Sequence, residues 1–278
     1  MHAVAKDTCW EARISLGFRL DAGRSMLSER SHQGPLRIQR PFYPEGPGVC
    51  HVYLLHPPGG VVCSDRLDIH IHVDERAHGL LTTPGAGKFY RSTARRCARQ
   101  HQHLRLERSA SLEWLPQENI FYEGTRCELL TRVDLQRGSR FIGWEINCLG
   151  RPASGETFRK GRLRQRFELW RDGTPLWLER NLFDESAVLN AAWGLQGQPV
   201  VATLVCTPAD RPLVDSVRNG VHAGADGLFA ATLADDVLVC RYLGRNGQAA
   251  RACLTAAWQC LRPAVLGRPA SPPRIWNT

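Results

Sequence analysis

The chain has 278 residues, of which 43% are hydrophobic and 23% are charged, and its formal net charge is +9. That balance is typical of a folded globular protein and excludes disorder over most of the length. No uncharged apolar run approaches the roughly 18 residues that a membrane-spanning helix needs, and residues 1–10 lack a secretory signal pattern, so we expect no membrane contact.

Alternating strands dominate the first half of the chain. Within residues 67–74, every second residue from Leu67 to Val73 is aliphatic and the others are polar. A period of two buries one face of a strand and leaves the other face in solvent. Residues 100–107 alternate less strictly, and residues 111–115 follow after a short break. We expect a strand at each place.

Further strands are predicted in the second half. Residues 162–170 and 175–180 flank Asp172-Gly173, a dipeptide that favours the tight turn of a β-hairpin. Residues 200–206 and 236–243 are more continuously apolar, which indicates strands with little solvent exposure.

Two stretches near the C-terminus have helical periodicity. Residues 211–221 and 248–261 each place their large apolar side chains on one stripe. We expect Pro263 to end the second helix, because proline has no N–H to continue the hydrogen-bond ladder. The Pro-rich tail, residues 268–278, is expected to be extended and to dock through Trp276.

Two loops contain glycines in patterns that can carry function. Residues 85–88 (Gly-Ala-Gly-Lys) resemble the end of a phosphate-binding loop, but Thr82 and Phe89 stand where that motif needs Gly and Ser or Thr. We therefore expect a turn there and no nucleotide site. In residues 56–60 (His-Pro-Pro-Gly-Gly), the two prolines fix the backbone and the two glycines then permit conformations closed to other residues. This combination favours a tight turn over a binding site.

Two His-x-His pairs are candidate metal ligands. His70 and His72 share one strand face, and His101 and His103 repeat the arrangement. The imidazoles of a pair are about 7 Å apart in a regular strand, too far to bind one ion without a further ligand such as a carboxylate. Imidazole suits nickel as well as zinc. Solvated positions on a polar face are the simpler interpretation.

Neither the basic residues nor a search for catalytic motifs decides the function. Arg91, Arg95, Arg96 and Arg99 form the densest basic group. No helix-turn-helix, stacking-aromatic signature or basic tail accompanies them, so an acidic protein partner suits this group at least as well as nucleic acid does. No G-x-S-x-G elbow, H-E-x-x-H motif or catalytic cysteine signature assembles a nucleophile.

Ten cysteines are present, and none has the C-x-x-C spacing of a zinc knuckle or redox site. Several, such as Cys206 and Cys240, stand inside apolar runs. We interpret them as reduced, buried thiols that act as small hydrophobic residues. Reduced thiols favour a cytoplasmic protein over a secreted disulfide scaffold.

Seven separated segments stand out along nearly the whole chain: residues 34–45 (GPLRIQRPFYPE), 53–60 (YLLHPPGG), 82–92 (TTPGA and KFYRS around Gly87), 112–118 (LEWLPQE), 149–152 (LGRP), 155–158 (GETF) and 273–276 (PRIW). In this order they resemble the UreD (also called UreH) urease accessory protein family.

This resemblance implies a mainly β, single domain over residues 1–278, built of stacked, solenoid-like sheets with about two helices in the C-terminal third. It implies a cytoplasmic, non-enzymatic protein that binds the accessory protein UreF and recruits the GTPase UreG. The assembly docks on apo-urease and couples GTP hydrolysis to nickel insertion. It further implies no tightly bound cofactor, transient Ni²⁺ and no nucleic-acid partner.

The resemblance also implies a route for the ion through the protein. By motif position its acidic candidates are Glu45, Asp65 and Glu179, and the strand pattern adds His72 as a weaker one. Each carboxylate has a structural alternative: Asp65 can cap the backbone amides of its loop, and Glu45 and Glu179 can pair with an arginine. The arginines between positions 91 and 99 are the candidate partner-binding residues.

Two positions depart from the family pattern. Cys63-Ser64 stands where relatives carry Gly-Gly before the aspartate, and Gly87 stands where they carry Thr or Ser. The first change should restrict the backbone beside Asp65 and adds a thiol that can bind a soft metal. Two other functions remain as alternatives to the scaffold: a metal-dependent hydrolase that uses the His-x-His pairs, and a nucleic-acid-binding module that uses the arginine group.

Overall fold

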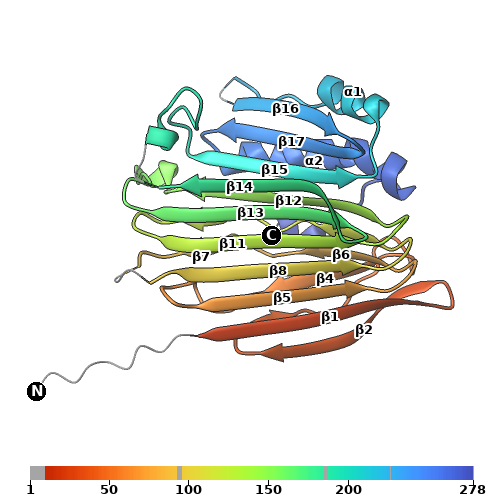
Figure 1. Ribbon diagram of the computed structural model, residues 1–278. Helices are drawn as coiled ribbons and strands as arrows, with labels where there is room; N and C mark the ends of the chain where they lie inside the picture. Colours follow the sequence, from red (N-terminus) through yellow and green to blue (C-terminus); the bar gives the residue numbers. More distant parts are fainter. Residues whose placement is uncertain (1–9, 93–95, 185–186, 226, 278) are drawn as a thin grey trace, which may run out of the picture.

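The computed structural model describes residues 10–92, 96–184, 187–225 and 227–277. Two stacked sheets account for most of these residues (Figure 1). Sheet I has the order β14-β13-β11-β8-β5-β1-β2 and sheet II has the order β16-β17-β15-β12-β9-β6-β4-β3.

Sheet I is built from seven strands: β1 (Glu11–Asp21), β2 (Arg24–Gln33), β5 (Arg66–Val73), β8 (Ala98–Leu106), β11 (Arg126–Leu135), β13 (Arg162–Arg171) and β14 (Thr174–Phe183). Sheet II contains β3 (Arg37–Ile38), β4 (Cys50–Leu55), β6 (His78–Thr82), β9 (Ser111–Trp114), β12 (Arg140–Leu149), β15 (Val200–Thr207), β16 (Gly227–Ala234) and β17 (Val237–Gly244). Two short strands, β7 (Gly87–Phe89) and β10 (Asn119–Phe121), pair with each other, and β10 also pairs with β12.

The chain winds between the sheets as a β-solenoid of about four turns. It alternates from sheet I to sheet II through β1 and β4, β5 and β6, β8 and β9, and β11 and β12. Within each sheet these strands pair in parallel. The predicted mainly β, solenoid-like fold class is confirmed.

Two hydrophobic cores flank sheet II. The first lies between the sheets and includes Phe18, Leu104 and Phe141. The second lies between sheet II and the helices α1 (Arg211–Gly220) and α2 (Gly247–Leu266), and includes Trp144 and Trp258. Because both of its faces are covered, β12 is buried at every position from its second residue to its last.

The strands predicted from alternation are present within two or three residues of the expected bounds. The Asp172-Gly173 hairpin is confirmed: Asp172 and Gly173 have φ values of 49° and 80° between β13 and β14. Both residues therefore adopt the left-handed conformation that a two-residue hairpin turn with this sequence requires.

The prediction that Pro263 ends the second helix was wrong. Helix α2 contains Pro263 and continues to Leu266, where Gly267 adopts φ 68° and donates its N–H to the carbonyl of Pro263. Proline removes only its own hydrogen bond near a helix end. Val265 and Leu266 are buried against sheet II, and their burial stabilises the extra turn.

The C-terminal tail docks as expected. Trp276 packs against Trp144 and Trp258, with ring centroids 5.7 Å and 5.9 Å apart, and its Nε1 donates to the Thr82 hydroxyl at 2.8 Å. The tail ends in a short 3-10 helix, Arg274–Asn277. Among the described helices, none is both long and apolar enough to cross a membrane.

Candidate functional site

A row of polar side chains, all buried except the half-buried Asn181, lies between the two sheets inside an otherwise apolar core. Its members come from six strands, β8, β11, β12, β13, β14 and β15, and each one points inward. They are Gln102, Thr131, Glu145, Gln165, Asn181, Glu179 and Thr203, and we call them the interior polar row. Hydrogen bonds of 2.5 to 3.4 Å join each member to the next.

Glu145 is the centre of the interior polar row and is 3% exposed. Burial, together with the nearby charge of Glu179, raises the pKa of Glu145 to about 7, although hydrogen bonds from Thr131 and Gln165 oppose this rise. The Thr131 hydroxyl lies 2.5 Å from Glu145 Oε1 and 3.1 Å from Gln102 Oε1. A hydroxyl has one proton to donate. A protonated Glu145 that donates to Thr131 therefore satisfies both contacts.

Glu179 ends the interior polar row on the side of β15 and β17. Its Oε1 accepts hydrogen bonds from Asn181 at 2.8 Å and from Thr203 at 3.4 Å. Its Oε2 lies 2.8 Å from Nη2 of Arg241 on β17. The carboxylate side chain is 6% exposed, whereas the side chain of Arg241 is 51% exposed. Arg241 therefore stands between Glu179 and the solvent.

A cavity of about 220 Å³ lies at the other end of the interior polar row, and Gln102 is one of its lining residues. The two loops singled out in the sequence, residues 56–60 and 85–88, form much of its wall. Trp114 also lines the cavity, and its Nε1 is buried without a hydrogen-bond partner. Gly60 must be glycine here, because a Cβ would lie 2.4 Å from the Tyr90 ring.

Asp65 caps the loop beside this cavity. Its Oδ1 accepts the backbone N–H of Trp10 at 3.1 Å and its Oδ2 accepts that of Val62 at 2.9 Å. Ser64 has a φ of 73°, a left-handed conformation that favours glycine. The family resemblance leads us to expect glycine at this position; the backbone keeps the glycine-like conformation, and Ser64 is strained in it.

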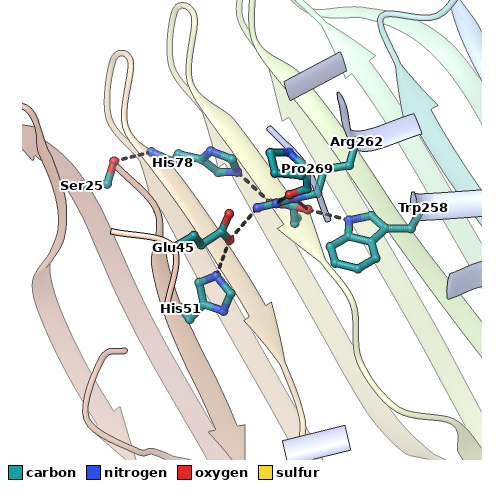
Figure 2. A network of polar contacts seen from close by, with 8 residues as sticks. Ser25, Glu45, His51, His78, Trp258, Arg262 and Pro269 are labelled. Atoms are coloured by element: carbon teal, nitrogen blue, oxygen red, sulfur yellow. Dashed lines mark hydrogen bonds and ion pairs between the residues drawn. The ribbon is translucent and has the colours of Figure 1, made fainter. Parts of the chain in front are cut away.

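Glu45 lies outside the space between the sheets, in a second polar network beneath α2 (Figure 2). His51 Nε2 lies 2.7 Å from Glu45 Oε1, and Nη2 of Arg262 donates to the same oxygen at 2.6 Å. Burial opposes ionisation of Glu45, but His51 and Arg262 outweigh it and lower the pKa to about 2.

The same network continues to Glu113, which is fully buried on β9. Arg262 Nε and Trp258 Nε1 of α2 donate to Glu113 Oε2 at 2.9 Å and 2.6 Å, and His78 Nε2 lies 2.9 Å from Oε1. Burial alone would raise the pKa of Glu113, yet His78 and Arg262 lower it. Arg262 thus pairs with both carboxylates, and this network anchors α2 on sheet II.

His72 lies on the outer face of sheet I. Its Nε2 is 3.1 Å from Asp74 and 3.5 Å from Glu107. On the same face, the His70 and His103 rings are 6.2 Å apart. No group of three or more His, Cys, Asp or Glu side chains placed to hold a metal ion is found within the described residues.

The structure describes three of the four predicted arginines, Arg91, Arg96 and Arg99. Arg99 points outward from β8, 3.7 Å from Glu128. Arg91 follows β7, where its side chain lies against Gly124. Arg95 lies outside the described residues. No disulfide joins any two of the nine cysteines that the structure describes.

The structure thus brings Glu179 together with residues that the sequence pattern did not single out, above all Glu145. A usable signal existed: Glu145 is the one acid inside an apolar strand, residues 141–149. Thr131, Gln102 and Gln165 interrupt the inward, apolar positions of three alternating strands. Oxygen ligands of this kind bind a divalent transition metal weakly enough to release it.

A scan against protein-family models matches residues 11–277 to the UreD urease accessory protein family. The chain is 46% identical to the "Urease accessory protein UreD" of Alcanivorax borkumensis, over 99% of this chain and 95% of that protein. It is 46% identical to the protein of the same description from Dechloromonas aromatica, over 97% and 95% of the two chains. It is 42% identical to the "Urease accessory protein UreD" of Enterobacter sp., over 97% of this chain and 96% of that protein.

Proposed function

The chain belongs to the UreD family of urease accessory proteins, and from this membership we propose that it works as a scaffold through which nickel reaches apo-urease. UreD accessory proteins are non-catalytic urease maturation factors. The ion is cargo in this proposal: the protein holds it briefly and makes or breaks no covalent bond.

The observation that carries the proposal is the interior polar row. It links the cavity at residues 56–60 and 85–88 to Glu179 near the far edge of sheet I, and it contains two carboxylates, two hydroxyls and three amides. The members of the row are hydrogen-bonded to one another, and apolar side chains of similar shape in their place could stabilise the core about as well. Stability alone therefore does not account for a continuous polar row through the solenoid, whereas transfer of a cation does.

Of the four residues predicted for the route, Glu179 belongs to the row and Asp65 lies beside its cavity. The charge of Asp65 acts on His56 of the cavity wall, whose pKa is lowered by burial and partly restored by Asp65. Glu45 is held by His51 and Arg262 beneath α2, and His72 lies on the outer face of sheet I. The route proposed here runs through Glu145 and Glu179 and does not include Glu45 or His72.

We further propose the partners that the family resemblance implies: the accessory protein UreF by direct contact, the GTPase UreG through the three-protein complex, and apo-urease. In this scheme UreG binds and hydrolyses the GTP. Residues 85–88, which lack the full phosphate-binding motif, wall a cavity instead. The complex is proposed to act in the cytoplasm, in keeping with the lack of a disulfide among the described cysteines.

The test is urease activation in cells that lack only this chain. We expect urease activity and nickel content to fall about tenfold or more, and wild-type chain to restore both. Glu179→Gln should restore them poorly while it still co-purifies with UreF. Arg180→Gln, a neighbour on β14 that points outward, is the matched control and should behave as wild type. Unchanged nickel content after deletion would refute the proposal.

A further inference from the structure

Sheet II extends beyond sheet I at the C-terminal end of the solenoid (Figure 1). Strand β14 is the last strand of sheet I, and its Glu179 reaches Thr203 of β15. Strands β17 and β16 continue sheet II past that point. The last turn of a solenoid needs a cap, because its inner face has no further turn to cover it. No described strand of sheet I covers the inner face of β16.

The side chains on this uncovered face follow from the strand register. Leu228 pairs with Leu243, and Ala230 pairs with Arg241. Leu243 packs against the core between the sheets, whereas Phe229 and Leu233 pack on the helix side. Leu228, Ala230, Arg241 and Leu243 therefore share the inner face, and we call them the end face. Leu228 is 59% exposed.

The sequence of β16 also lacks the features that protect a sheet edge. Edge strands are usually protected by charge, by proline or by being very short. Among the other strands at the ends of the two strand orders, β2 carries several charges, β14 has Pro175 and Arg180, and β3 has two residues. Strand β16 is eight residues without a charge or a proline. We therefore expect a partner protein to cover this end of sheet II when the chain is part of its complex.

The backbone edge of β16 is less open than its face. Arg218 of α1 donates its Nε–H to the carbonyl of Ala231 at 2.8 Å, which satisfies one acceptor of that edge. Addition of a further strand would have to displace this contact. The exposed face beside Arg241 is the better place for a partner.

Arg241 supplies the positive charge and the hydrogen-bond donors of the end face. One of its nitrogens lies 2.8 Å from Glu179 Oε2, yet that oxygen makes no aligned hydrogen bond. The guanidinium also lies 6.0 Å from the centre of the Trp177 ring. Five N–H donors in a planar fork suit a second carboxylate, and half of the side chain is open to solvent. A cation that approaches Glu179 from this side meets the positive charge of Arg241.

We propose that the end face is the docking surface for a segment of a partner protein that presents a carboxylate to Arg241 beside an apolar side chain on Leu228, and that docking draws Arg241 away from Glu179. This inference rests on the proposed function. A second copy of the chain does not fit this description, because its own end face offers an arginine and no carboxylate to Arg241. Docking thereby opens the end of the interior polar row.

Binding measurements with purified proteins test the docking. Leu228→Asp and Arg241→Glu should each weaken binding to UreF or to apo-urease at least about tenfold, which corresponds to about 1.4 kcal/mol. Leu178→Asp and Arg180→Glu are the matched controls, since both are exposed on the outer face of β14, and they should bind within about twofold of wild type. Circular dichroism and melting temperature confirm that the variants fold.

Nickel titration of the isolated chain tests the opening of the row. Arg241→Gln should bind Ni²⁺ several-fold more tightly than wild type, because Glu179 loses its cation, and Arg180→Gln should not. Wild-type affinity of Leu228→Asp and Arg241→Glu for both partners would overturn the docking and leave the proposed function standing. Wild-type nickel affinity of Arg241→Gln would overturn the gating. If the wild-type chain binds neither partner, the proposed function falls with the inference.

Discussion

At the scale of single residues, Glu145 has the environment that matters most for the route. Its carboxyl is buried, accepts a hydrogen bond from Gln165 at 2.9 Å, and has its pKa raised from 4.5 to about 7. A folded-state pKa above the unfolded value means that the folded chain holds a proton which the unfolded chain releases. The stability from Glu145 is therefore complete below about pH 4.5 and is lost as the pH rises to about 7.

We predict that Glu145→Gln removes this pH dependence. The amide can donate to Thr131 and accept from Gln165, so the hydrogen bonds survive the substitution. Between pH 5 and pH 8 the free energy of unfolding of wild type should fall, relative to that of the variant, by about 2 to 3 kcal/mol. Urea unfolding at the two pH values measures this difference. Parallel curves for the two proteins would show that Glu145 is ionised throughout.

The sequence predicted only part of this site. Glu179 was predicted only through the family resemblance, because a carboxylate in an alternating strand does not reveal which face of the strand is covered. Glu145 was not predicted as a site residue, because its partners Thr131 and Gln165 come from other turns of the solenoid. Which strands lie opposite each other depends on the winding of the chain, and local periodicity carries no information on that winding.

At the scale of elements, α2 is anchored by charge as well as by apolar packing. Arg262 is fully buried and bridges Glu45 and Glu113, which come from the loop before β4 and from β9. Removing one partner of a buried ion pair leaves the other charge without compensation. Because the pKa of Glu45 is lowered to about 2, its contribution is present above about pH 4.5 and is lost as the pH falls toward 2.

We predict that Arg262→Met destabilises the protein by about 3 kcal/mol or more and speeds amide hydrogen exchange in α2. Arg211→Met is the matched control, because Arg211 makes an exposed pair with Asp215 on α1. Its cost should stay within about 0.5 kcal/mol. Equal exchange rates in α2 for both variants would show that apolar packing alone holds this helix.

The elements themselves were the most predictable level. Clean alternation located β5, a looser alternation located β8 with β9 after it, and apolar periodicity located both helices. The end of α2 was missed because local rules treat Pro263 as a stop, whereas Val265 and Leu266 are buried by tertiary packing. Tertiary contacts of this kind override local preference, and a single sequence does not display them.

At the scale of the whole molecule, stability rests on the stacked sheets and the buried ion pairs. The described residues contain no disulfide, and they contain no group of three metal ligands. A structural metal adds its binding free energy to folding, so a chelator destabilises the proteins that depend on one. A cargo ion held by scattered oxygen ligands makes no such contribution.

We therefore predict that EDTA leaves the melting temperature of the purified protein unchanged within about 1 °C. Added Ni²⁺ should raise that temperature only when its concentration exceeds its dissociation constant, since a ligand stabilises the folded state by mass action. The rise should shrink in Glu179→Gln and persist in the outward control Arg180→Gln. A large drop in melting temperature with EDTA would instead reveal a resident metal and would replace transient passage with permanent binding.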